Sequence, residues 1–126
     1  MLSRISGVIK NYDWGSKDLV PDFFGIEKSS QPIAEIWLGT HPLGESQTIS
    51  ENRPLSESLG KQLNFLVKFL SAERALSIQV HPNPQQAKDG FHFEQAQGIS
   101  LDDPKRNYKD DSHKPEALVA LTKFQA

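Results

Sequence analysis

Three segments of the chain carry apolar residues in patterns typical of β-strands: residues 33–38, 65–70 and 76–81. They alternate apolar and polar positions or run apolar for about six residues, which is the length and period of a strand. Gly and Pro separate them, with turns expected at residues 39–44 and 52–54. The spacing predicts a mainly β fold with antiparallel strands.

Helix is predicted over residues 83–90, where Asn83 is a good cap, Pro84 occupies the first helical position and Gly90 is a natural stop. A second short helix is expected at residues 91–97, and a single helical turn at 56–59 that Gly60 closes. Residues 98–113 are polar and lack periodicity, so they are predicted to form a long loop. Such a loop is either a binding or lid element or a disordered linker.

Composition narrows the function classes. The length of 126 residues fits one soluble domain. The net charge of −2, from 14 basic and 16 acidic residues, does not indicate binding to nucleic acid or to a membrane surface. Neither a signal peptide nor an apolar run of membrane-spanning length is present. A small-molecule partner and a cytoplasmic location are therefore expected. Without cysteine, any metal must be held by nitrogen and oxygen ligands.

A first candidate metal site lies at the end of the third predicted strand. Side chains two residues apart share one face of a strand, so Ser77, Gln79 and His81 line up opposite an apolar face. The Gln79 carbonyl and a neutral His81 nitrogen can reach one cation, and Pro82 ends the strand. The alternative is an ordinary solvated strand face.

Residues 113–116, with the sequence His-Lys-Pro-Glu, form the second candidate. Glu116 would stand at the mouth of a strand formed by residues 117–121, where its carboxylate completes an oxygen, nitrogen and oxygen ligand set suited to Zn²⁺ or another borderline divalent ion. The alternative is a surface salt bridge between Lys114 and a nearby acid. The chain then stops soon after this strand, so we expect an unfinished domain edge.

Two charged residues interrupt predicted strands. Lys68 lies inside an apolar run, where an ammonium is costly unless it meets an anion or reaches water, so it is a candidate for binding an anionic substrate. Glu35 would share a face with Trp37, and near a metal it could orient a ligand. The alternatives are a solvent-exposed face for Lys68 and an exposed edge-strand position for Glu35.

Together these segments resemble the type I mannose-6-phosphate isomerases (phosphomannose isomerases), which are metal-dependent enzymes built on cupin-type jelly-roll β-barrels. The resemblance covers the whole chain and is carried by motifs at residues 11–16 (NYDWGS), 34–42 (AEIWLGTHP), 65–72 (FLVKFLSA), 75–82 (ALSIQVHP), 106–110 (RNYKD) and 113–116 (HKPE).

The resemblance implies a role for each candidate. Gln79, His81 and Glu116 would be ligands of one Zn²⁺ per site. Lys68 and Ser77 would lie near the sugar phosphate and Trp14 in the surrounding wall. Lys114 and Glu35 would lie close to the metal as the catalytic candidates, with the base itself left open.

The family's site also needs a fourth ligand, a histidine, and an arginine from a later part of a longer chain. His41, His92 and His113 do not occupy a position that would replace this ligand. We therefore expect residues 1–126 to be the N-terminal part of a truncated cupin-type catalytic domain. A complementing chain or self-association would then be needed to complete it.

The function that the resemblance implies is the interconversion of mannose 6-phosphate and fructose 6-phosphate, in carbohydrate metabolism that leads to GDP-mannose. Proton transfer between C2 and C1 through an enediol needs a base, charge stabilisation and a phosphate anchor. The alternative function is a non-catalytic cupin-like module that binds metal or sugar phosphate. A cupin oxygenase is less consistent, since its iron sites use two histidines and a carboxylate.

Overall fold

The computed structural model describes residues 2–123, and the chain divides after Ser77 into two compact units. Across these residues the architecture is mainly β, with seven short strands and three helices. The strands do not close into a barrel within the described part of the chain. None of the helices described is both long enough and apolar enough to cross a membrane.

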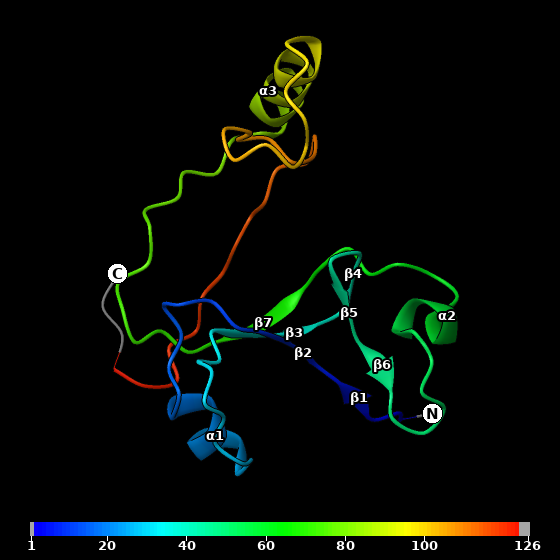
Figure 1. Cartoon of the computed structure of the whole chain (residues 1–126). Helices are drawn as coiled ribbons and strands as arrows, with labels where there is room; N and C mark the ends of the chain where they lie inside the picture. The colour runs from blue at the N-terminus through cyan, green and yellow to red at the C-terminus, as the bar shows by residue number, and fades with distance from the viewer. Residues whose placement is uncertain (1, 124–126) are drawn as a thin grey trace. The chain divides into compact units, whose positions relative to one another are not determined.

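A three-stranded antiparallel sheet forms the centre of the first unit (Figure 1). Its order is β2 (Val8–Lys10), β3 (Glu35–Leu38) and β7 (Val67–Leu70), with β3 in the middle. Strands β3 and β7 confirm two of the predicted segments, each two residues shorter at its N-terminal end. Directly paired residues share a face of the sheet, and Trp37 pairs with both Val8 and Lys68.

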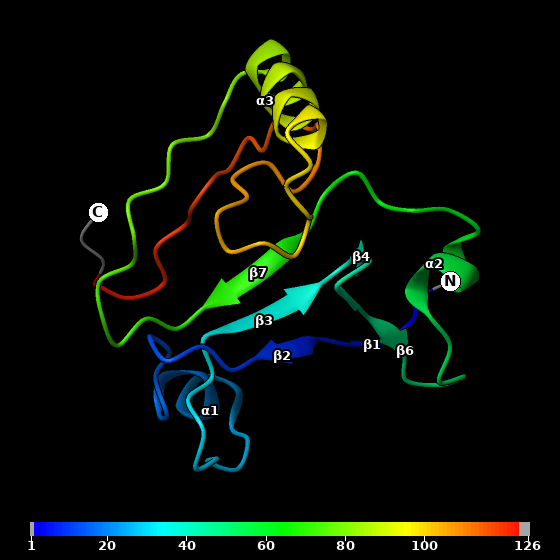
Figure 2. The ribbon, with the colours of Figure 1, turned by 45° about the horizontal axis from the view of Figure 1, so that its top comes forward.

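Two smaller antiparallel pairs extend this unit (Figure 2). Strand β1 (Ile5–Ser6) pairs with β6 (Gln47–Thr48), and β4 (Thr40–His41) pairs with β5 (Gly44–Glu45). The turn predicted at residues 39–44 is therefore the tight connection of the β4–β5 hairpin.

The first unit also holds two short helices, α1 (Leu19–Phe24) and α2 (Leu55–Leu59). Helix α2 is the predicted helical turn, and it ends at Gly60, whose N–H donates to the Glu57 carbonyl while the following Lys61 N–H donates to the Ser56 carbonyl. Helix α1 was not predicted, because Pro21 stands in its interior. The core that these elements enclose is small and consists of Val20, Ile33, Ala34, Trp37 and Leu55.

The second unit is built around one helix, α3 (Pro84–Ala96). It begins as predicted, with the Asn83 side chain accepting from the Gln86 N–H and the Gln86 side chain accepting from the Asn83 N–H. The prediction of two helices separated at Gly90 is wrong. Gly90 lies inside the helix, and the Tyr108 ring packs directly on it, so a β-carbon there would be only 2.3 Å from the ring.

Two further strand predictions are also wrong within the described residues. Residues 76–81 and 117–121 are not in a β-ladder, and their apolar side chains face solvent, with Ile78 97% and Val119 82% exposed. A strand forms only where the backbone N–H and C=O groups of a neighbour pair with its own, and among the described residues neither segment has such a backbone pairing. The loop predicted at residues 98–113 is confirmed as free of helix and strand.

Candidate metal centre and substrate-binding residues

The second unit brings together two residues that lie far apart in sequence, His81 and Glu116. Their Nε2 and Oε2 atoms are 3.4 Å apart, and the side chains are 33% and 62% exposed. An imidazole nitrogen and a carboxylate oxygen therefore face the same small volume and remain open to solvent.

The separation of these two atoms fits a shared zinc ion. A hydrogen bond between a charged donor and a carboxylate is normally about 2.7–2.9 Å long. In a tetrahedral site with Zn–N and Zn–O bonds of about 2.0–2.1 Å, two ligand atoms lie about 3.3–3.4 Å apart. The 3.4 Å between His81 and Glu116 matches this second value. The donor set present here thus suits a borderline divalent cation.

Gln79, the third predicted ligand, is exposed, and the structure does not bring its amide into this pair. Residues 2–123 contain no group of three or more His, Cys, Asp and Glu side chains placed to hold a metal. The structure thus assembles two of the three predicted ligands.

Lys114 forms a salt bridge with Asp110, four residues earlier in the chain. Its Nζ lies 2.9 Å from Oδ2 and 3.1 Å from Oδ1 of Asp110, and the side chain is half exposed. This is the surface salt bridge that the sequence left open as the alternative. His113 lines a neighbouring cavity of about 390 Å³, together with Pro84, Lys88, Asp111 and Ser112.

In the first unit, Glu35, Trp37 and Lys68 lie on one face of the central sheet. The buried Glu35 carboxylate accepts a hydrogen bond from the Trp37 indole N–H through Oε2. The same oxygen lies 4.0 Å from Lys68 Nζ, which is 4.9 Å from the centre of the Trp37 ring. Lys68 therefore meets an anion while about a third of its side chain stays accessible, and Glu35 shares a face with Trp37 as predicted.

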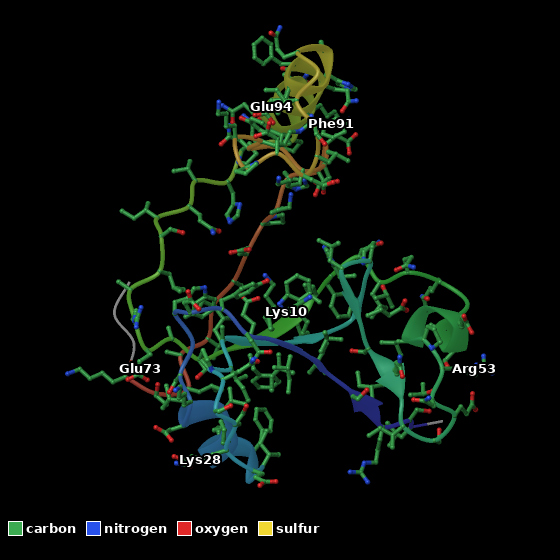
Figure 3. The ribbon with its side chains drawn as sticks, viewed as in Figure 1. Lys10, Lys28, Arg53, Glu73, Phe91 and Glu94 are labelled. Carbon is green, nitrogen blue, oxygen red and sulfur yellow. The ribbon has the colours of Figure 1, made fainter. Side chains whose placement is uncertain are left out.

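Lys10 belongs to the same cluster and was missed in the sequence. Its ammonium lies over the Trp37 ring, 4.4 Å from the centre, and donates to the Leu43 carbonyl at 2.6 Å (labelled in Figure 3). Lys10 pairs with Glu35 across the sheet. Only the strand register could have revealed it, because a lysine at the end of a short strand carries no local signal.

The remaining candidates, Trp14 and Ser77, also belong to the first unit. Trp14 is half-buried and stacks on Tyr12, with ring centres 5.8 Å apart, while Ser77 is exposed. Beside Trp14 lies an open cavity of about 500 Å³ with carboxylates and cations in its wall, lined by Asp13, Gly15, Lys17, Asp18, Pro32, Glu73 and Arg74.

Hydrogen bonds and ion pairs shift the pKa values of Glu45, Lys28 and Glu94. Hydrogen bonding to Ser56 lowers the pKa of Glu45, first through the Ser56 side chain and then through its backbone N–H, which donates to Glu45 Oε1 at 2.6 Å. Hydrogen bonds with Asp18 and then Asp22 raise the pKa of Lys28. The Tyr108 N–H is the leading cause of the lowered pKa of Glu94. Each shift stabilises the charged form of the group.

Comparison with known proteins shows that this chain is similar to one class of proteins, isomerases that act on a sugar phosphate. Residues 2–126 match the family described as phosphomannose isomerase type I, catalytic domain. Among curated relatives, mannose-6-phosphate isomerase of Escherichia coli (strain K12) is 40% identical over 99% of this chain and 37% of its own length. The Schizosaccharomyces pombe enzyme is 38% identical over 98% of this chain and 32% of its own.

Solved structures agree with the sequence match. A mannose 6-phosphate isomerase bound with zinc and yttrium has a TM-score of 0.79 and 37% identity, covering 88% of this chain and 33% of that one. The Salmonella typhimurium enzyme bound to fructose 6-phosphate and zinc has a TM-score of 0.74 and 35% identity, covering 89% and 33%.

The chain belongs to the type I phosphomannose isomerase family. It spans about a third of the length of the curated relatives it matches. The predicted fold class, a partial cupin-type barrel, is confirmed by the match to these structures.

Proposed function

We propose that this chain contributes to a zinc-dependent aldose–ketose isomerase that interconverts mannose 6-phosphate and fructose 6-phosphate. The observation that carries the proposal is the approach of His81 Nε2 to Glu116 Oε2 at 3.4 Å, in a chain aligned over nearly its whole length with such isomerases. Residues 1–126 form the N-terminal part of a cupin-type catalytic domain in this proposal.

Gln79, His81 and Glu116 are proposed as the residues that hold one zinc ion. Imidazole, carboxylate and amide oxygen are ligands that Zn²⁺ accepts. When bound, zinc polarises substrate oxygens and offsets negative charge on an enediolate. The exposed Gln79 side chain is free to turn toward the pair, since it lies two residues before His81.

Lys68 and Ser77 are proposed to bind the phosphate group of the substrate. Lys68 keeps about a third of its side chain accessible, and an ammonium with a hydroxyl makes charge-assisted hydrogen bonds to phosphate oxygens. Trp14 is proposed to contribute an aromatic wall to the sugar site. The presence of fructose 6-phosphate in the Salmonella typhimurium relative supports a sugar phosphate as the ligand.

Proton transfer between C2 and C1 of the opened sugar is proposed to involve Lys114 or Glu35. Lys114 is bound to Asp110, so it must leave this partner and give up one proton before its amine can accept a proton from the substrate. Glu35 is oriented by the Trp37 N–H and the Lys68 ammonium, which keeps its carboxylate in one position. A cytoplasmic location, a place in GDP-mannose formation and a complementing chain or self-association stay predictions.

The decisive experiment measures zinc content and affinity of the purified chain. Gln79→Ala, His81→Ala and Glu116→Ala are compared with the parent, with isomerase turnover recorded in parallel. His92→Ala, which removes an exposed histidine of α3, is the matched control. We expect stoichiometric zinc in the parent and in the control, and loss in the three variants.

Other results would redirect the proposal. Zinc that stays bound in all three variants would rule out this ligand set. Zinc and sugar-phosphate binding without turnover would favour the non-catalytic binding module, and iron-dependent O₂ consumption would favour an oxygenase. Lys68→Met should weaken binding of inorganic phosphate while leaving zinc affinity unchanged.

A further inference from the structure

Most of the chain between His81 and Glu116 folds into one helix with a loop packed against it. Residues 84–109, called the α3 insertion below, consist of helix α3 and the loop that returns along it. The helix begins three residues after His81, and the loop ends seven residues before Glu116. Whatever holds the insertion together therefore also limits how far these two residues can separate.

A buried arginine organises the returning loop. The Arg106 side chain is fully buried, with Nε donating to the Tyr108 carbonyl at 2.7 Å and Nη1 to the Ile99 carbonyl at 2.5 Å. Its guanidinium lies over the Phe91 ring of α3, 5.0 Å from the centre. A planar group with several donors can join points of a loop that lie apart in sequence.

Glu94 completes this arrangement from the helix side (Figure 3). Its carboxylate lies 3.3 Å from Arg106 Nε and accepts the backbone N–H of Tyr108 at 2.8 Å and of Asn107 at 3.0 Å. The Asn107 amide adds a further bond at 3.1 Å. A buried carboxylate with these partners is costly to disturb, because each lost bond leaves a desolvated group.

The tightest contact in the insertion is steric. The Tyr108 ring lies so close to Gly90 that a β-carbon on Gly90 would be 2.3 to 2.6 Å from three of its carbons. Glycine inside a helix costs about 1 kcal/mol relative to alanine. The chain nevertheless has glycine at position 90, where any larger residue would collide with the Tyr108 ring of the loop. Lys109 then closes the loop by donating to the carbonyls of Leu101 and Asp103.

We propose that the α3 insertion sets the separation of His81 and Glu116, with Glu94, Arg106 and the packing of Tyr108 on Gly90 as positioning elements. With the insertion rigid, only residues 82–83 and 110–115 remain as adjustable chain. A flexible insertion would make residues 82–115 one long loop, and the greater closure entropy would weaken a metal site that joins its ends roughly five- to tenfold. The zinc part of this inference rests on the proposed function.

The variant Gly90→Ala distinguishes an effect on the separation of His81 and Glu116 from an effect on the stability of helix α3. The added methyl group should raise or preserve the helicity of α3 while displacing Tyr108. Phe93→Ala is the matched control, because Phe93 is 65% exposed on the same helix and alanine there also favours helix. Helix content is followed by circular dichroism.

The separation itself is measured without metal. Spin labels on Val80→Cys and Val119→Cys, both exposed positions in a chain without cysteine, report the distance between the two segments. We expect a narrow distribution in the parent and in Phe93→Ala, and a broad one in Gly90→Ala. In a Tyr108→Ala background, Gly90→Ala should add no broadening, because the ring it displaces is absent.

Zinc affinity is the second readout. The dissociation constant should rise roughly five- to tenfold in Gly90→Ala and stay unchanged in Phe93→Ala. If Gly90→Ala loses helix, Glu94→Gln decides the question instead, since it removes the charge facing Arg106 without adding volume. Unchanged distances and zinc affinity in both variants would overturn the inference. Broadened distances in a chain that binds no zinc would support it while refuting the proposed metal site.

Discussion

The ammonium of Lys10 lies 4.4 Å from the centre of the Trp37 ring, and the absence of a side chain at Gly44 makes room for both groups. A β-carbon at Gly44 would lie 3.1 Å from Lys10 Nζ and 3.1 Å from Trp37 Cε3. The β4–β5 hairpin therefore packs against both Lys10 and the indole ring of Trp37. A cation held over an aromatic face in this way contributes about 0.5–2 kcal/mol, depending on its solvation.

Gly44→Ala is accordingly expected to destabilise the chain by about 1–3 kcal/mol, the usual cost of inserting a methyl group into a packed contact. Urea unfolding followed by tryptophan fluorescence measures the loss. In a Lys10→Ala background the cost should fall, because one of the two crowded groups is gone. An equal cost in both backgrounds would place the strain at Trp37 alone.

Trp37→Phe should destabilise the first unit by about 1–3 kcal/mol beyond the lost ring volume. The phenyl ring cannot donate a hydrogen bond to the buried Glu35 carboxylate, which then has an unsatisfied oxygen. Trp14→Phe, at a half-buried position, is the control and should cost less. If Trp37→Phe/Glu35→Gln is no more stable than Trp37→Phe, the carboxylate is not the source of the cost.

Acid should weaken the α3 insertion through Glu94. Hydrogen bonds, first from the Tyr108 N–H, hold the pKa of Glu94 below its ordinary value of 4.5. The unfolded chain therefore takes up this proton at a higher pH than the folded chain does. The contribution to stability is complete above pH 4.5 and is lost as the pH falls through the folded value.

Amide hydrogen exchange of residues 107 and 108 as a function of pH tests this expectation. Protection in the parent should decline as the pH falls below 4.5, after correction for the intrinsic exchange rate. In Glu94→Gln this decline should be absent, and protection should be lower at neutral pH. A variant with the same pH profile as the parent would assign the acid sensitivity to another group.

Polar substitutions at the exposed apolar positions should have little effect on stability. Ile78→Ser and Val80→Ser change side chains that are 97% and 90% exposed, so each should alter the free energy of unfolding by no more than about 0.5 kcal/mol. Thermal unfolding of the 126-residue chain checks this. Ile33→Ser, at a position only 3% exposed, should cost several times more. A large cost at Ile78 would mean that this segment is packed in solution.

Local patterns predicted those elements that depend on neighbours in sequence. The Asn83 cap and Pro84 mark the start of α3, and Gly60 marks the end of α2, because capping uses groups within one turn. The apolar pattern predicted the strands around Trp37 and Lys68 correctly, because these two segments pair with each other inside the same unit. Residues 76–81 show the same alternation but have no ladder partner among the described residues, so the pattern alone overestimated strand there.

The sequence by itself determined the family, the ligand types available without cysteine and the candidates Gln79, His81 and Glu116, since all three depend on residue identity and order. Tertiary structure alone decided that His81 meets Glu116, that Lys10 covers Trp37 and that Gly90 continues a helix. Each of these is a contact between residues distant in sequence. Such contacts follow from strand register and loop closure, which no local pattern encodes.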